Sequence, residues 1–219
     1  MPLYKTINHS ENTTIYVWKI SESYSELANI TLKNSSEIRL GGMKSELHQK
    51  GFLSVRHLLK IAGYTDFDLY YNEYGKPLLK DGKHISITHS FQFSGIIISD
   101  TDVGIDIEKN RPKIVKIQNK FVNTTVDSLS DEDIVKQLTV VWGAKESMYK
   151  IYPYGGLSFH NHIAIDPFLF AENKSSGRVI FGDWKKYYEV FFTFFVEGFT
   201  LVYALPSIKK KDKSKKVKV

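Results

Sequence analysis

The sequence contains no cysteine, and this absence excludes disulfide bonds and metal sites built from thiolates. It also lacks a long apolar run, because the most apolar stretch, residues 190–205, is interrupted by Glu197 and Gly198. The first residues, MPLYKTINHSENTT, contain no apolar signal segment. We therefore expect a protein without a membrane span that works in the cytoplasm.

Outside one short segment, the chain also lacks an excess of basic residues. It holds 30 Lys and Arg against 24 Asp and Glu, but residues 208–219 contribute seven of the lysines and one aspartate. The remaining chain therefore holds 23 residues of each sign. Blocks of like charge are typical of solvated tails, and we interpret residues 208–219 as a basic disordered tail. A basic nucleic-acid-binding protein is an alternative that the neutral body disfavours.

The remaining composition predicts a globular domain of the α+β class. With 219 residues, 42% of them hydrophobic, the chain can bury a substantial core. β-Branched and aromatic residues predict strands, and helical spacing of apolar residues predicts helices. The predicted strands are residues 14–20, 84–87, 94–99 and 103–108, with a hairpin flanking Glu197 and Gly198. The predicted helices are residues 36–62 and 130–149.

The two halves of the chain repeat one order of elements: a strand, a helix, a loop and a hairpin. We expect a tandem pseudo-duplication in which two similar α/β subdomains cover residues 1–101 and 102–207, followed by the tail of residues 208–219. A site built from both subdomains would lie in the cleft between them. We expect the protein to be a monomer.

The segment VGIDIE, residues 103–108, carries two carboxylates on one face of a predicted strand. Asp106 and Glu108 share one parity, and the apolar Ile105 and Ile107 share the other. Two carboxylates at this spacing repel each other, and a divalent cation would convert the repulsion into binding. A strand with a solvated acidic edge is the structural alternative.

A second segment, WGAKESMYK at residues 142–150, carries Glu146 and Lys150 one helical turn apart. On its own this spacing also fits an ordinary surface ion pair. A third segment is EYGKP at residues 73–77, followed by THS at residues 88–90. In it, glycine and proline favour a turn around Lys76. His89 could equally be a hydrogen-bonded histidine of the core.

Taken in order, GKP with THS, GIDIE, and WGAKES followed by Lys150 resemble the motifs of the 4′-phosphopantetheinyl transferase superfamily. The similarity is to the larger, pseudo-dimeric type that activates surfactin synthetase and similar carriers. It is close over residues 67–159 and extends loosely to almost the whole chain. The resemblance implies a holo-[acyl-carrier-protein] synthase type of enzyme. Such an enzyme transfers the phosphopantetheine arm of coenzyme A to a serine of an apo acyl or peptidyl carrier protein, leaving adenosine 3′,5′-bisphosphate.

By this resemblance, Asp106, Glu108 and Glu146 are the ligands of Mg²⁺, with Mn²⁺ as an alternative, since hard cations prefer oxygen donors. Lys150 is expected at the α-phosphate of coenzyme A, where charge builds on the leaving group. Glu146 is also the candidate base for the serine hydroxyl, acting directly or through a water molecule. The motif is compatible with direct proton transfer to Glu146 and with transfer through water.

The resemblance also implies contacts to coenzyme A outside the acidic cluster. The expected phosphate-binding residues are Lys76, Thr88, His89 and Ser90. Further nucleotide contacts are expected at Lys44, Arg56, His57 and Lys145. For Trp142, which also matches the family motif, we expect packing in the core.

A possible docking surface lies between the second and third motifs of the chain. Lys113, Lys116 and Lys120 recur at helical spacing, which predicts a basic amphipathic helix over this segment. Carrier proteins of this family's reactions are typically acidic, so the lysine face would steer their association. A solvated lysine face is the alternative.

Two positions depart from the family pattern. Thr88 replaces a small residue or serine and keeps a hydroxyl, whereas Phe91 replaces a glycine and adds bulk beside the nucleotide or the carrier. A non-catalytic homologue that only binds coenzyme A or carrier is the alternative function. The intact Asp106, Glu108 and Glu146 disfavour it.

Overall fold

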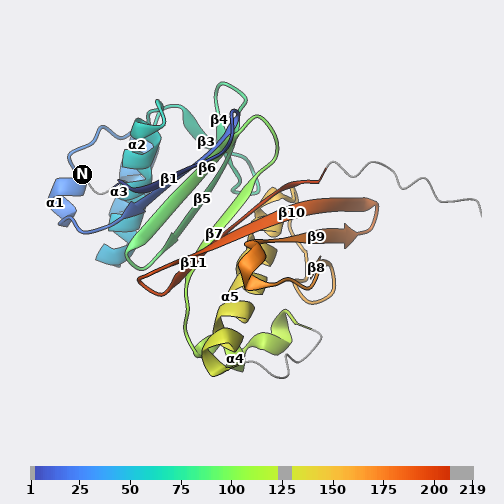
Figure 1. Cartoon of the computed structure of the whole chain (residues 1–219). Helices are drawn as coiled ribbons and strands as arrows, with labels where there is room; N and C mark the ends of the chain where they lie inside the picture. Colours follow the sequence, from blue (N-terminus) through green and yellow to red (C-terminus); the bar gives the residue numbers. More distant parts are fainter. Residues whose placement is uncertain (1–2, 123–129, 208–219) are drawn as a thin grey trace, which may run out of the picture.

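The computed structural model describes residues 3–122 and 130–207, which form two antiparallel sheets flanked by helices (Figure 1). This arrangement confirms the predicted α+β class. In the part of the chain that the structure describes, no helix has the length and apolar composition needed to cross a bilayer.

The first sheet has six strands in the order β1-β2-β6-β5-β4-β3. They are β1 (Leu3–Ser10), β2 (Thr13–Lys19), β3 (Leu69–Tyr71), β4 (Pro77–Leu79), β5 (His84–Ser90) and β6 (Phe93–Ser99). Between β2 and β3 the chain forms three helices, α1 (Tyr24–Leu27), α2 (Asn34–Gly41) and α3 (Glu46–Ile61). The buried side of α3 packs on this sheet through Leu53, Val55 and Leu59.

The single helix predicted over residues 36–62 is wrong, because α2 and α3 are separate helices. The adjacent Gly41 and Gly42 end α2, and Ser45 is the N-cap residue of α3. Each glycine costs a helix interior about 1 kcal/mol relative to alanine, so two in succession favour a break. The break lets α3 cover the sheet while Leu40 of α2 packs into the same core.

The second sheet has five strands in the order β7-β11-β10-β9-β8. They are β7 (Gly104–Lys109), β8 (Ile163–Ile165), β9 (Lys174–Phe181), β10 (Trp184–Phe195) and β11 (Phe199–Pro206). Its helices are α4 (Lys113–Lys116) and α5 (Asp131–Ile151), with short 3₁₀ turns at η1 (Gln118–Lys120) and η2 (Phe170–Glu172). The predicted strands, the predicted hairpin (β10 and β11) and the predicted helix over residues 130–149 (α5) are confirmed.

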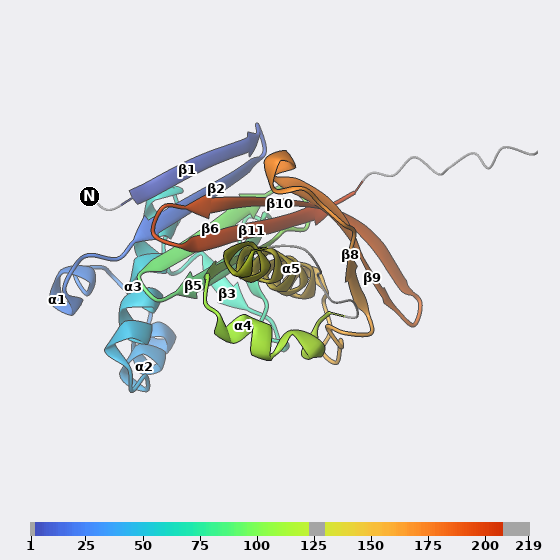
Figure 2. The same cartoon turned by 60° about the horizontal axis from the view of Figure 1, so that its bottom comes forward.

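The two sheets pack face to face between an outer layer of α3 and an outer layer of α5. Figure 2 shows α5 nearly end-on beneath β10 and β11. The inner layer between the sheets is apolar and joins β2 and β6 to β7 and β11. Its members include Ile15, Val17, Phe93, Ile97, Ile105, Ile107, Phe199 and Leu201. At one side of this layer, β7 of the second sheet lies against β5 of the first (Figure 1).

Candidate active site

The strands β5 and β7 belong to different sheets and are joined by hydroxyl side chains of β5. The backbone N–H of Ile105 donates to Ser86 Oγ at 3.2 Å, and the backbone N–H of Ile107 donates to Thr88 Oγ1 at 3.0 Å. These bonds satisfy buried amides of β7 that face the neighbouring sheet. These two hydrogen bonds therefore fix the alignment of β7 along β5.

The same row of hydroxyls reaches the two predicted carboxylates. Thr88 Oγ1 donates to Asp106 Oδ1 at 3.3 Å, and Ser90 Oγ donates to Glu108 Oε2 at 3.3 Å. Thr88 and Ser90, predicted as phosphate contacts, thus hold the acidic side chains. The sequence analysis missed this role and missed Ser86. The signal was the alternation of hydroxyls in ISITHS, which places all three on one face of β5.

Glu146 joins the two carboxylates because α5 approaches β7 closely. A Cβ atom on Gly104 would lie 1.9 Å from the backbone oxygen of Ser147, and one on Gly143 would lie 2.8 Å from Val202 Cγ2. Only glycine fits at these two contacts. The glycines of GIDIE and WGAKES therefore let the helix close on the sheet, a second role that the sequence analysis missed.

In the acidic cluster formed by Asp106, Glu108 and Glu146, burial and mutual repulsion raise the pKa values of the two glutamates. Burial, followed by the negative charges of Asp106 and Glu108, raises the pKa of Glu146 to about 7, although Lys150 opposes the shift. Burial and the charge of Asp106 also raise the pKa of Glu108. Asp106 is 6% exposed, and its Oδ2 atom is buried without a hydrogen-bond partner among the described residues.

These features fit a bound divalent cation, although the side chains do not form a ready cage. Within the described residues, no three histidine or acidic side chains stand close enough together to hold a metal ion as they are. Mg²⁺ usually keeps several waters and needs only one or two protein carboxylates. An orphaned carboxylate oxygen on Asp106, beside two acids with raised pKa values, is the kind of donor set that such an ion would stabilise.

Lys150 lies beside Asp106 at the edge of the cluster. Its Nζ donates to the backbone oxygen of Ile105 at 2.7 Å and to Asp106 Oδ1 at 3.0 Å. Among the described residues, its ion pair is with Asp106 and not with Glu146, so the surface-pair alternative for WGAKESMYK is wrong. Lys150 is thereby fixed next to the acidic cluster.

Lys150 also lines a cavity of about 390 Å³ whose walls come from both halves of the chain. The cavity collects basic and aromatic side chains: the cations Arg39, Lys76 and Lys150, the imidazole of His89, and Tyr71, Tyr74, Tyr149 and Tyr154. Lys76 Nζ donates to the backbone oxygen of Ile151 at 3.1 Å, which ties the GKP turn to the end of α5. This cavity can hold a phosphorylated ligand with an apolar or aromatic part.

His89 stands at this cavity with its ring against α3. A Cβ atom on Gly51 would lie 3.3 Å from His89 Cγ, so the ring packs directly on the helix backbone. Burial, and then the charges of His48, Lys150 and Arg39, lower the pKa of His89. Arg39, at the end of α2, was not predicted; its guanidinium lies 5.1 Å from the centre of the Tyr71 ring.

The other predicted nucleotide contacts lie apart from the acidic cluster. Arg56 is buried, where its Nε donates to Asp66 Oδ1 at 3.0 Å, and His57 bonds the backbone oxygen of Leu27 at 2.9 Å. Both residues therefore hold α3 to its surroundings. Lys44 is exposed in the loop between α2 and α3.

Lys145 points away from Glu146 and into the core. It is 5% exposed, and its Nζ donates to the backbone oxygens of Phe159 and Ile163. Burial lowers its pKa to about 8. Trp142 packs against the rings of Phe121 and Phe159 but is only half-buried, so it lies at the edge of the core and not within it.

The basic helix predicted around Lys113, Lys116 and Lys120 is wrong in its extent. Helix α4 covers only Lys113–Lys116, and Lys120 follows in a 3₁₀ turn. Helices this short are marginal without tertiary packing. The lysines also face different spaces: Lys113 lines a cavity of about 200 Å³ beside Glu108, and Lys116 lines a separate one.

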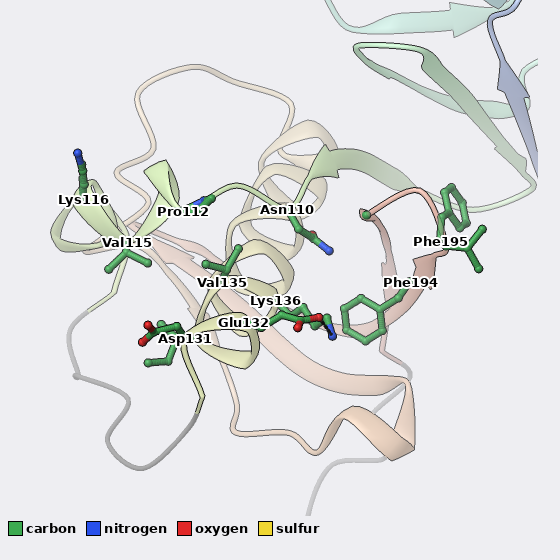
Figure 3. A pocket seen from close by; sticks show the side chains of 13 residues that line it. Asn110, Pro112, Val115, Lys116, Asp131, Glu132, Val135, Lys136, Phe194 and Phe195 are labelled. Atoms are coloured by element: carbon green, nitrogen blue, oxygen red, sulfur yellow. Dashed lines mark ion pairs between the residues drawn. The ribbon is translucent and has the colours of Figure 1, made fainter.

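That separate cavity, of about 990 Å³, lies between α4, the first turns of α5 and the end of β10 (Figure 3). Figure 3 shows Val115, Val135, Phe194 and Phe195 around it, with Asp131, Glu132 and Lys136 on α5. Its charges include the exposed ion pair between Lys136 and Glu132, at 2.7 Å. The space is thus mainly apolar and does not share the acids Asp106 and Glu146.

No protein-family model matches the chain. The chain is similar to the 4′-phosphopantetheinyl transferase gsp of Aneurinibacillus migulanus, with 29% identity over 143 residues. The match covers 62% of this chain and 58% of that protein, so it spans somewhat more than half of the relative's length.

Proposed function

We propose that this chain, which is similar to the 4′-phosphopantetheinyl transferase gsp, transfers the 4′-phosphopantetheine group from coenzyme A to a serine of an apo acyl or peptidyl carrier protein. The products are the holo carrier and adenosine 3′,5′-bisphosphate. The observation that carries this proposal is the ion pair between Lys150 and Asp106, where burial and the charge of Asp106 also raise the pKa of Glu108 and Glu146, beside a cavity that Lys150 lines together with Arg39 and Lys76. Three acids and phosphate-binding cations together suit a metal-assisted transfer of a phosphorylated group.

We propose that the site lies in the cleft between two subdomains of duplicated origin, residues 1–101 and 102–207. The strand orders support this. In each half a first strand is followed by helices and a four-strand meander whose last strand returns beside the first: β2-β6-β5-β4-β3 and β7-β11-β10-β9-β8. The edge strand β1 is the addition in the first half.

Asp106, Glu108 and Glu146 would hold Mg²⁺, or Mn²⁺ in its place, through carboxylate oxygens. The ion would polarise the diphosphate of coenzyme A and neutralise its charge. Lys150 is positioned beside Asp106 to stabilise charge on the leaving α-phosphate. Lys76, His89 and the unpredicted Arg39 line the adjoining cavity and would bind the remaining phosphates, with Lys44 as a further surface contact.

Glu146 is the proposed base that receives the proton of the serine hydroxyl, directly or through one water. A bound cation would favour the charged form of Glu146, and the ionised carboxylate is the form that can accept this proton. The hydroxyl row of β5 keeps Asp106 and Glu108 fixed while this proton moves. We expect the carrier to approach on the side of Lys113, next to Glu108.

The test is to incubate the protein with coenzyme A, Mg²⁺ and several apo carrier proteins, and to weigh the carriers by mass spectrometry. We expect a phosphopantetheine mass gain on at least one carrier. Asp106→Asn and Glu146→Gln should each lower the rate by at least about 100-fold while the circular dichroism spectrum is kept. Binding of coenzyme A without any mass gain would favour the non-catalytic alternative.

A further inference from the structure

Phe91 adopts a backbone conformation that is unfavourable for a bulky side chain. It is the first residue of the two-residue turn between β5 and β6, where Ser90 pairs with Phe93. Its φ angle is +51°, and among the described non-glycine residues only Asn173 also has a positive φ. A left-handed backbone at an aromatic residue stores strain, and such strain tends to persist where a site requires it.

Burial in a core does not account for the strained residue. The Phe91 side chain is 38% exposed. Its ring instead crosses from the turn of the first sheet to the second sheet, where it meets the Phe199 ring edge to face at 6.4 Å. Lys109 Nζ lies 5.3 Å and Arg111 Cζ lies 5.0 Å from the centre of the same ring. One aromatic ring therefore holds two exposed cations at the end of β7 and just after it.

The two cations held by Phe91 line the cavity of about 200 Å³ next to Glu108. Lys113 is the third cation of this cavity, and Ile114, Ile117 and Trp142 supply the apolar part of its wall. Three cations outnumber the one carboxylate, so the space favours an anion that carries an apolar stem. Ser90, the neighbour of Phe91, donates to Glu108, so this anion would lie beside the acidic cluster.

We propose that Phe91 is a positioning residue that holds Lys109 and Arg111 at this cavity to receive an acidic side chain of the carrier protein near its modified serine. This inference rests on the proposed function. A protein carboxylate suits the cavity because its methylene groups can pack on the apolar wall. The phosphates of coenzyme A have their own cations, Lys76 and Lys150, in the cavity of about 390 Å³.

The experiment compares Phe91→Gly, Phe91→Leu and Phe91→Tyr in steady-state transfer from coenzyme A to an apo carrier. Loss of the ring in the glycine and leucine variants should raise KM for the carrier by roughly three- to tenfold and leave kcat and KM for coenzyme A unchanged. Phe91→Tyr should behave as the original protein. Lys109→Gln should raise the carrier KM in the original background and have much less effect in Phe91→Gly.

The matched control is Asn173→Gly, which changes the other left-handed residue at the start of β9, outside both cavities. It should leave KM for the carrier unchanged, and neither glycine variant should melt at a lower temperature. If Phe91→Gly and Phe91→Leu both kept a normal KM for the carrier, this inference would be overturned while the proposed function would stand. The same holds if both variants raised KM for coenzyme A as much as KM for the carrier. Absence of transfer by the unaltered protein would instead overturn the proposed function, and this inference with it.

Discussion

At the scale of single residues, the raised pKa of Glu146 links the stability of the fold to pH. In the unfolded chain a glutamate titrates near 4.5, whereas in the folded protein the pKa of Glu146 is about 7. Between these two pH values the folded state keeps a proton that the unfolded state has lost. Stability therefore falls as the pH rises through this window, by up to about 3 kcal/mol.

The change Glu146→Gln removes this titration. In the presence of a chelator, the variant should be more stable than the original protein by about 2–3 kcal/mol at pH 8, with the difference vanishing near pH 4.5. Urea unfolding at several pH values measures this, with the exposed Glu37→Gln as control. Added Mg²⁺ should reduce the difference at pH 8, since the ion would favour the charged form. A difference that does not vary with pH would contradict the assignment of the pKa.

The buried Arg56 provides a second prediction at this scale. Arg56 and Asp66 have side chains that are 3% and 0% exposed, and Asp66 also accepts the backbone N–H of Lys33. Arg56→Met leaves the Asp66 carboxylate buried without its cation. The free energy of unfolding should fall by about 3–5 kcal/mol.

The same variant separates a structural role from the predicted nucleotide contact. Below its melting temperature, Arg56→Met should keep the affinity for coenzyme A within about twofold, as judged by calorimetry, because its guanidinium is occupied by Asp66. The paired change Arg56→Met with Asp66→Asn should recover part of the lost stability. A large loss of coenzyme A affinity in a stable variant would show instead that Arg56 contributes to nucleotide binding.

At the scale of elements, the sequence predicted the strands that are rich in β-branched and aromatic residues and the long helix α5. Strand β6 is buried along its whole length, and a run such as FSGIIIS is recognisable without any alternation. The strands β1 and β9 and the short strands β3, β4 and β8 were not predicted, because their positions depend on pairing within the sheets more than on composition. The three acids were found as motif residues, but the hydrogen bonds that Thr88 and Ser90 donate to Asp106 and Glu108, and the one that Ser86 accepts from β7, depend on contact between two sheets.

The contact between α5 and β7 gives the prediction at this scale. Gly104→Ala would place a methyl group 1.9 Å from the backbone oxygen of Ser147, so the helix must move. We expect a loss of stability of about 3 kcal/mol or more, and loss of transfer because Glu146 moves with α5. Thermal unfolding and the carrier assay measure the two effects.

The control for this change is Gly41→Ala at the end of α2, where an added Cβ meets no atom within 4 Å. This variant should be unchanged or more stable by up to about 1 kcal/mol. Equal stability of Gly104→Ala and the original protein would show that α5 can shift without cost. The close approach would then not explain why Glu146 reaches β7.

At the scale of the whole molecule, one apolar layer belongs to both sheets. Phe93 of β6 is fully buried, and its ring lies 5.4 Å from the Phe195 ring and 4.8 Å from the Phe199 ring of the second sheet. The candidate site lies at the margin of this layer, where β5 meets β7. Motif spacing could not predict the layer, because it joins three separate segments of the chain that begin at Ile15, Phe93 and Phe195.

A shared layer implies that the two sheets unfold together. Phe93→Ala should lower the free energy of unfolding by about 3–5 kcal/mol and keep a single transition. Hydrogen exchange read by mass spectrometry should show that amides of β6 and of β11 lose protection by the same amount, since both are exposed only in global unfolding. Phe67→Ala makes the same change at a residue that is 49% exposed and should cost less than about 1.5 kcal/mol. If β11 kept its protection in Phe93→Ala while β6 lost it, the second sheet would be stable alone. The acids of β7 would then persist without the hydroxyl row of β5.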